Sequence, residues 1–145
     1  MQLSPNFTLA EMCASDTARR RGIANDPLAA DVRRLEALCR QVLQPIRDRF
    51  GPIHVESGYR SARLNEIVGG TRGSAHRFGA AADLWGVGRR VSCEEIWRWC
   101  IAEMQRGMPI DQVIWERRGA AEWVHVGMVT PGRMAPRNMA FKDWR

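Results

Sequence analysis

The chain has 145 residues, of which 45% are hydrophobic and 26% are charged, and a formal net charge of +6. These values are typical of a single globular domain with a substantial core, and no apolar run approaches the roughly 20 residues of a membrane-spanning helix. A basic surface attracts polyanions, among them nucleic acid and anionic bacterial cell wall, and charge alone does not distinguish these partners.

Helix signals dominate the first third of the chain. Thr8-x-x-Glu11 is a capping box that opens a short first helix. The run Arg19-Arg20-Arg21 favours a solvated loop. Asp26 and Pro27 then suit the N-cap and first position of a long helix, which Pro45 should end or kink. Its apolar stripe comprises Leu28, Val32, Leu35, Cys39, Val42 and Ile46.

Strand signals dominate the rest. Alternating or small-residue apolar segments predict strands over residues 53–56, 80–85, 112–115 and 123–128. Helices are expected over 61–68 and from the capping box Ser92-x-x-Glu95 to about residue 106. The tail after Pro131 looks irregular and is expected to pack over one edge. Helices first and strands mostly later predict one α+β domain over residues 1–145, with an antiparallel sheet.

The four cysteines, Cys13, Cys39, Cys93 and Cys100, form no CxxC pair. Residues 1–10 lack the basic start and apolar stretch of a secretory signal, so we expect the chain to be made in the cytoplasm. In that compartment scattered cysteines are reduced, buried small residues rather than a disulfide framework.

Two of the three histidines lie in short, defined contexts. The first context is Ser-x-His-x2-Gly-x-Ala-x-Asp, which contains His76 and Asp83, and the second is Glu122-Trp123-Val124-His125. Two imidazoles and one carboxylate can supply three ligands to a zinc ion and leave the fourth position open for water, as in catalytic zinc sites. Each residue alone also fits ordinary packing, but the combined pattern favours a hydrolase.

Strand alternation tests this arrangement. It places Trp123 and His125 on one face and Val124 on the core face. In the same way it places the side chain of Asp83 on the face opposite that of its two immediate neighbours. Glu122 lies three residues before His125, so a straight strand would send it to the opposite face. Its role as a base therefore requires a turn near Gly119. Glu116 is the competing carboxylate, and a salt bridge with the adjacent arginines explains it well.

With these motifs the chain resembles the zinc D-Ala-D-Ala carboxypeptidases and the phage L-alanyl-D-glutamate endopeptidases. These are the LAS metallopeptidases of peptidase family M15, subfamily A, which share a fold with the hedgehog signalling domain. The segment Glu56-Ser57-Gly58-Tyr59-Arg60-Ser61 resembles one whose arginine lies in the active site. Leu64-Asn65 and Val68-Gly69-Gly70 follow as in many phage-type members, and the resemblance spans about residues 7–128.

The resemblance implies a role for each matched residue. His76, Asp83 and His125 would bind one Zn²⁺, and Glu122 would be the base. Arg60 would stabilise an oxyanion or hold a substrate carboxylate, and Ser74 and Tyr59 are candidate substrate contacts. His54 is expected to be structural. The fold implied is hedgehog/DD-peptidase-like, with the zinc site on an antiparallel sheet and helices on its other face.

The function implied is hydrolysis of peptide bonds in peptidoglycan stem peptides, by a monomeric phage or prophage endolysin that acts on the wall after release. The alternative is a non-catalytic zinc-binding or phage structural module that binds cell wall. A nucleic-acid binder is disfavoured, because no recognition helix or aromatic stacking array is evident. Which peptide bond is cleaved stays open between carboxypeptidase and endopeptidase.

Overall fold

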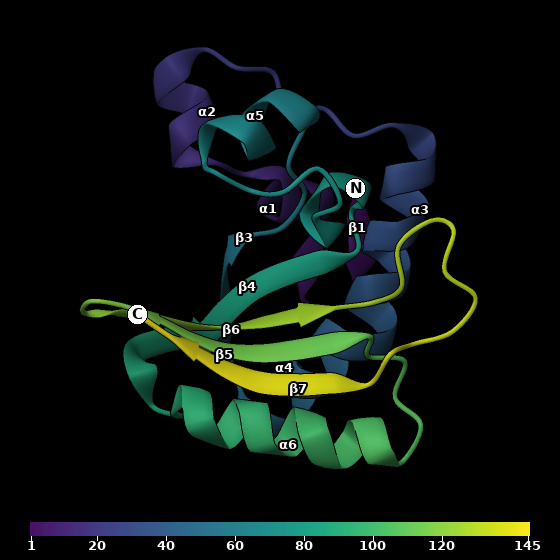
Figure 1. Cartoon of the computed structure of the whole chain (residues 1–145), viewed down its shortest axis with the longest axis vertical. Helices are drawn as coiled ribbons and strands as arrows, with labels where there is room; N and C mark the ends of the chain where they lie inside the picture. The colour runs from purple at the N-terminus through teal and green to yellow at the C-terminus, as the bar shows by residue number, and fades with distance from the viewer.

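A five-stranded sheet forms the centre of the molecule, and the computed structural model describes all 145 residues (Figure 1). In sheet order the strands are β3 (Ile53–Ser57), β4 (Ala81–Gly86), β6 (Ala121–Gly127), β5 (Gln112–Arg118) and β7 (Met139–Trp144). Neighbouring strands are antiparallel, except that β7 runs parallel to β5. The predicted α+β class is confirmed, but the sheet is mixed rather than wholly antiparallel. A short hairpin of β1 (Gln2–Ser4) and β2 (Phe7–Thr8) precedes it.

The tail does not have the predicted irregular conformation over its whole length. Residues 139–144 form β7, an edge strand whose register with β5 runs from Met139 opposite Gln112 to Trp144 opposite Arg117. Five of its six residues are exposed, so its sequence lacks the buried alternation that would mark a strand. The long loop of residues 128–138 carries the chain from β6 past β5 to this edge of the sheet (Figure 1).

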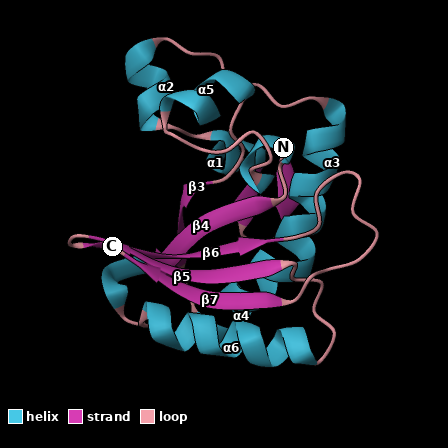
Figure 2. Cartoon of the chain, viewed as in Figure 1, coloured by secondary structure: helices cyan, strands magenta, loops and turns pink.

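The helices cover one face of the sheet and its β3 end (Figure 2). They are α1 (Leu9–Cys13), α2 (Asp16–Arg21), α3 (Ala29–Leu38), α4 (Gln44–Phe50), α5 (Ala62–Ile67) and α6 (Cys93–Gln105), with short helical segments η1 (Cys39–Leu43), η2 (Ala75–Phe78) and η3 (Val87–Arg89). Thr8 caps α1 by accepting from the Glu11 N–H, but the return bond of the predicted capping box is absent, whereas Ser92 and Glu95 form the predicted capping box of α6. Arg19-Arg20-Arg21 is solvated as expected, but it lies in α2 rather than in a loop. No helix is both long and apolar enough to cross a bilayer.

The predicted long helix is a continuous run of α3, η1 and α4. It begins two residues later than expected, because Leu28 takes the N-cap position and its N–H donates to the Asp31 carboxylate at 3.0 Å. Leu28 is therefore exposed and does not belong to the buried stripe. Pro45 does not end the helix. The Gln44 N–H bonds to the Cys39 carbonyl in π-helical register, and this wider turn accommodates the proline that follows.

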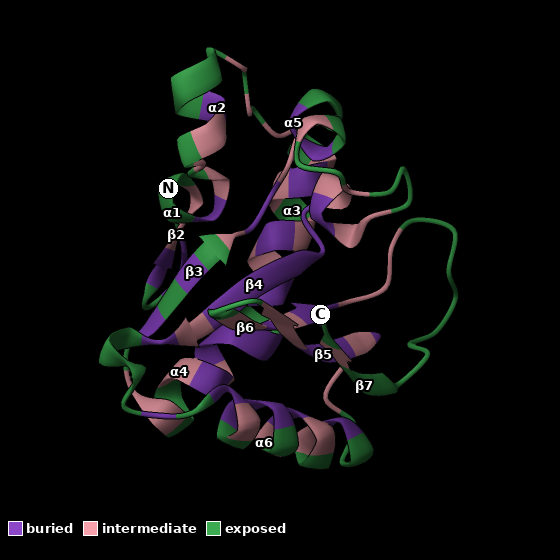
Figure 3. Ribbon diagram, turned by 60° about the vertical axis from the view of Figure 1, so that its left-hand side comes forward, coloured by how far each residue is buried: buried purple, intermediate pink, exposed green.

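One face of the sheet packs on the helices and forms the core. Val113, Val124 and Val126 are fully buried there with Leu84, and the helix stripe of Leu35, Cys39, Val42 and Ile46 packs in the same cluster. Figure 3 shows β4 buried along most of its length, whereas most of α2 and most of the loop between β6 and β7 are exposed. The opposite face of the central strands carries polar side chains and faces a cavity.

All four cysteines are unpaired. Cys39, Cys93 and Cys100 are buried, in agreement with their predicted role as small core residues, and Cys13 is half-buried. Burial raises the pKa of both the Cys39 and the Cys100 thiol to about 12. These thiols are therefore protonated and unreactive at neutral pH.

Candidate metal centre

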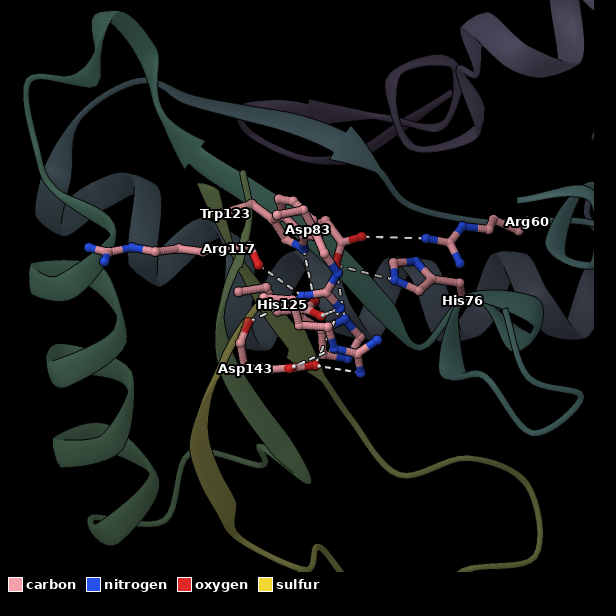
Figure 4. Close-up of polar contacts among 10 residues, drawn as sticks. Arg60, His76, Asp83, Arg117, Trp123, His125 and Asp143 are labelled. Carbon is pink, nitrogen blue, oxygen red and sulfur yellow. Dashed lines mark hydrogen bonds and ion pairs between the residues drawn. The ribbon is translucent and has the colours of Figure 1, made fainter. Parts of the chain in front are cut away.

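Three side chains from separate elements meet on the open face of the sheet. His76 comes from η2, Asp83 from β4 and His125 from β6, and Asp83 is directly opposite His125 in the antiparallel pair. Asp83 Oδ1 lies 2.9 Å from His125 Nδ1 and 3.3 Å from His76 Nε2 (Figure 4). One potential ligand atom from each residue lies within 4.8 Å of the others. The structure thus brings together the three residues that the sequence pattern singled out.

Gly79 explains how the segment between the first two ligands packs. It ends η2 with φ +70°, and a Cβ there would lie 2.6 Å from the Asp31 carbonyl oxygen and 2.9 Å from Leu35 Cγ. The glycine is therefore needed for η2 to pack against α3.

A backbone carbonyl orients His76. The Gly58 carbonyl oxygen lies 2.7 Å from His76 Nδ1, and because a carbonyl only accepts hydrogen bonds, Nδ1 carries the proton. The lone pair is then on Nε2, which faces Asp83 and His125. Such an outer contact fixes the tautomer and direction of a metal-binding imidazole.

The charge of Asp83 also suits a ligand. Burial opposes ionisation, but His76 and His125 outweigh this effect and hold the pKa of Asp83 below its ordinary value. Two imidazoles and one carboxylate are the N and O donors that zinc accepts, and three protein ligands leave a position open. The residues present therefore fit a single zinc ion of the catalytic kind.

Arg60 is held beside the cluster by three contacts. Its Nε donates to Ser57 Oγ at 3.0 Å, and its two terminal nitrogens contact Asn65 Oδ1 at 3.3 Å and Asp83 Oδ2 at 3.4 Å. Burial lowers the pKa of Arg60, while Asp83 and Glu116 oppose this shift. A guanidinium has five N–H donors, so two stay available to a substrate. The orienting role of Asn65 was not apparent from the sequence.

Glu122 does not reach the cluster. Strands β5 and β6 pair without interruption from Arg118 opposite Ala121 to Gln112 opposite Gly127, so the turn that a base at Glu122 requires is absent. Its Oε1 accepts a 2.7 Å hydrogen bond from Trp115 Nε1 on the face opposite His125. Arg117 extends in the same direction, away from the cluster (Figure 4).

Glu116 takes the place expected for Glu122. It lies on β5 opposite Trp123, on the same face as His125, and lines the cavity that contains the cluster. Trp123 Nε1 donates to its Oε2 at 2.8 Å, and Arg118 lies 3.3 Å from its Oε1. The expected salt bridge is present, yet it leaves the carboxylate in the cavity with its side chain 15% exposed.

The remaining sequence candidates divide between the cavity and the core. Ser74 lines the cavity just before η2 and makes no side-chain hydrogen bond within the chain. Tyr59 is a buried core residue that lines an adjoining cavity rather than this one, and its substrate contact stays a prediction. His54 pairs with Glu56 and packs on Trp85, which agrees with a structural role.

The cavity around the cluster has a volume of about 660 Å³. The residues that argue for chemistry there are Arg60, Ser74, His76, Asp83, Glu116 and His125. It thus combines three potential metal ligands, a carboxylate outside the ligand set and a partly free guanidinium, which is the arrangement expected of a hydrolytic metal site.

Comparison with known proteins agrees with this assignment. The family profile described as Peptidase M15 matches residues 5–127. The chain is also 39% identical over 93 residues to the zinc D-Ala-D-Ala carboxypeptidase of Streptomyces albus G, an alignment that covers 61% of this chain and 34% of that protein. The chain therefore spans about a third of the length of this curated relative. Because the profile covers most of its residues, the chain belongs to the peptidase M15 family.

Proposed function

We propose that this chain is a zinc-dependent peptidase that hydrolyses peptide bonds in peptidoglycan stem peptides. The observation that carries the proposal is the cluster of His76, Asp83 and His125 in a cavity that also holds Glu116 and Arg60. Membership of a peptidase family and the name of the Streptomyces relative support the same reaction and substrate class.

His76 Nε2, an Asp83 carboxylate oxygen and His125 Nδ1 are the atoms that would hold the ion. When bound, zinc lowers the pKa of a water molecule to about 7 and polarises a carbonyl group. The chain supplies the orientation of its ligands through the contact between His76 and the Gly58 carbonyl.

Glu116 is the group that moves the proton. Trp123 Nε1 fixes Oε2, so the carboxylate is held in the cavity and can take a proton from the attacking water and return it to the leaving amine. Arg60 uses its two free N–H groups to bind the substrate carbonyl oxygen or a substrate carboxylate. The Ser74 hydroxyl is free to donate to the substrate backbone.

The biological role that fits this chemistry is that of a phage or prophage endolysin, made in the cytoplasm as a monomer and acting on the wall after release. Support comes from the phage-type segments Leu64-Asn65 and Val68-Gly69-Gly70, and from a net charge of +6 that favours an anionic wall. The same resemblance supports a hedgehog/DD-peptidase-like fold.

The alternative is a zinc-holding module that binds cell wall without cutting it. Glu116 and Arg60 argue against this alternative, because a binding module needs neither a carboxylate outside the ligand set nor a buried, oriented guanidinium beside it. Both lie in the cavity within reach of the same substrate.

The test is mass spectrometry of purified peptidoglycan after digestion by the zinc-loaded protein, with Glu116→Gln and Glu122→Gln proteins alongside. We expect new stem-peptide fragments from the wild type and from Glu122→Gln, but none from Glu116→Gln. An unchanged digest across several wall types would favour the binding module. Loss of fragments only in Glu122→Gln would return the base to Glu122.

A further inference from the structure

A second cavity of about 450 Å³ adjoins the first at the candidate metal centre. Arg60, Val68, Asp83 and Trp123 line both cavities, so open space lies on both sides of Asp83, whereas His76 and His125 line the first cavity. The second cavity is enclosed on its far side by α2 and by the end of β3. We name it the α2 arm and the larger cavity the Arg133 arm, after the loop residue that lines it.

We propose that an acidic peptide lies across both arms, so that the bond cleaved is internal to the peptide. This inference rests on the proposed peptidase function and goes beyond it by choosing the substrate. A peptidase that removes one terminal residue needs a pocket that closes just beyond the scissile bond. Here each arm lies within the roughly 300–1,000 Å³ of sites that accommodate drug-sized ligands, which leaves room for more than one residue on either side.

The charges in the Arg133 arm show which group it can recognise. Arg137 is bound to the Asp111 carboxylate, with contacts of 2.7 and 3.1 Å, and Arg118 lies 3.3 Å from both Glu116 and Asp143. The side chain of Arg133 is exposed and has no hydrogen-bond or ion-pair partner in the chain. Arg133 is thus the guanidinium that this arm offers to a substrate carboxylate.

The α2 arm resembles the Arg133 arm, because its acidic side chains are paired within the chain and one arginine is free. Asp16 pairs with Arg19 at 2.9 Å, and Glu56 pairs with His54 at 2.9 Å. Arg20, on the exposed face of α2, lines the arm without an intramolecular partner. A peptide that carries a carboxylate on each side of its scissile bond would satisfy both free guanidinium groups.

The first measurement compares two N-acetylated stem pentapeptides of one sequence, with a free or an amidated C-terminus, digested by the zinc-loaded protein and followed by mass spectrometry. We expect cleavage at the same internal bond in both peptides. Release of only the C-terminal residue, abolished by amidation, would overturn the inference and leave the peptidase function standing.

The second measurement tests the arginines with the same pentapeptide and with a version whose side-chain carboxylate is an amide. Arg133→Gln or Arg20→Gln should lower kcat/KM for an acidic peptide by about threefold to fivefold, as expected of exposed ion pairs. The variant that lacks the arginine bound to the side-chain carboxylate should have no effect on cleavage of the amide version. Arg98→Gln is the matched control, since Arg98 is an exposed α6 arginine outside both arms. Equal activity of all three variants on the acidic peptide would contradict the inference.

A binding experiment separates the two proposals if no peptide is cleaved. Isothermal titration of the acidic pentapeptide into zinc-loaded Glu116→Gln protein measures occupancy of the cleft without chemistry. Binding that weakens in the Arg20→Gln and Arg133→Gln backgrounds would support the two-armed cleft while the peptidase function fails. Binding that is insensitive to both changes, or absent, would overturn the cleft as well.

Discussion

Two glutamates of the β5–β6 hairpin make the same contact on opposite faces of the sheet. Glu116 accepts a hydrogen bond from Trp123 Nε1 on the cavity face, and Glu122 accepts one from Trp115 Nε1 on the other face. Both carboxylates are therefore well satisfied locally, and only their faces distinguish them. Since an antiparallel pair without a bulge keeps strict alternation, Glu116 shares the face of His125 and Glu122 does not.

Exchanging each carboxylate for an amide tests this distinction. We expect Glu116→Gln to lower kcat by roughly 10²–10⁴-fold, because the amide cannot accept the proton of the attacking water. Glu122→Gln should stay within a few-fold of the wild type, since an amide oxygen still accepts the Trp115 hydrogen bond. Steady-state cleavage of a stem peptide measures both effects. Zinc content determined by atomic absorption should be equal in the two variants, which excludes loss of metal as the cause.

The same pair shows how far the sequence could predict the site. The ligands followed from motif spacing and from alternation around His125 and Asp83, both of which the structure reproduces. Glu116 was considered only as the competitor of Glu122, and the predicted strand ended at residue 115, whereas β5 continues to Arg118 and carries Glu116 onto the face of Ile114. A local salt bridge explained Glu116 equally well, and only the tertiary structure shows that the two roles coexist.

At the scale of elements, the contact between η2 and α3 positions the first ligand. Gly79→Ala should lower the free energy of unfolding by roughly 2–4 kcal/mol, because a left-handed φ and a clash with the Asp31 carbonyl add together. Gly22→Ala is the matched control, since Gly22 ends α2 at φ +63° and a Cβ at that position would have no atom within 4 Å. Urea denaturation measures both variants. Equal losses would show that backbone strain alone, and not packing against α3, requires Gly79.

The elements themselves were predictable where the pattern was local. The caps of α1 and α6 and the buried stripe of the long helix follow from short motifs and periodicity, and the structure confirms them. The π turn before Pro45 and strand β7 were not predictable in this way. β7 depends on parallel pairing with β5 and on anchoring of the preceding loop at Asp111, neither of which leaves a periodic signal in residues 139–144.

Ionisation of Asp111 makes the stabilisation by this loop anchor depend on pH. It is buried, and its carboxylate accepts hydrogen bonds from the Arg137 backbone N–H and guanidinium. Burial opposes its ionisation, but Arg137 outweighs this effect and holds the pKa of Asp111 below its ordinary value. A lowered folded pKa means that the stabilisation is complete above the unfolded value of about 4 and is lost as the pH falls through the folded pKa.

Asp111→Asn should therefore cost about 1–2 kcal/mol of unfolding free energy at pH 7, and less as the pH approaches 3. Urea denaturation of both proteins in the presence of a chelator, at a series of pH values, measures the difference. Protonation of the metal ligands affects both proteins equally, so it cancels in the difference between their unfolding free energies. A difference that stays constant with pH would show that the charge of Asp111 contributes nothing.

At the scale of the whole molecule, the three ligands join segments that are distant in the chain. η2, β4 and β6 each contribute one ligand, so an ion bound by all three would link the helical end of the domain to the centre of the sheet. Because the unfolded chain cannot hold these residues together, binding adds to the stability of the folded state by mass action. The thermal midpoint therefore reports the metal site independently of any enzymatic activity.

We expect removal of zinc by a chelator to lower Tm by about 10 °C relative to protein with free zinc at 100 times Kd, since such binding contributes about 2.7 kcal/mol and each kcal/mol shifts a domain of this size by about 4 °C. Differential scanning calorimetry with and without zinc measures the shift, and readdition of zinc should restore it. His76→Ala should abolish the zinc-dependent shift. His54→Ala, at the one histidine outside the cluster, should retain it in full. A shift of equal size in both variants would mean that the ion binds elsewhere. Of the two substituted histidines, His76 has a ring nitrogen directed at Asp83, and His54 does not.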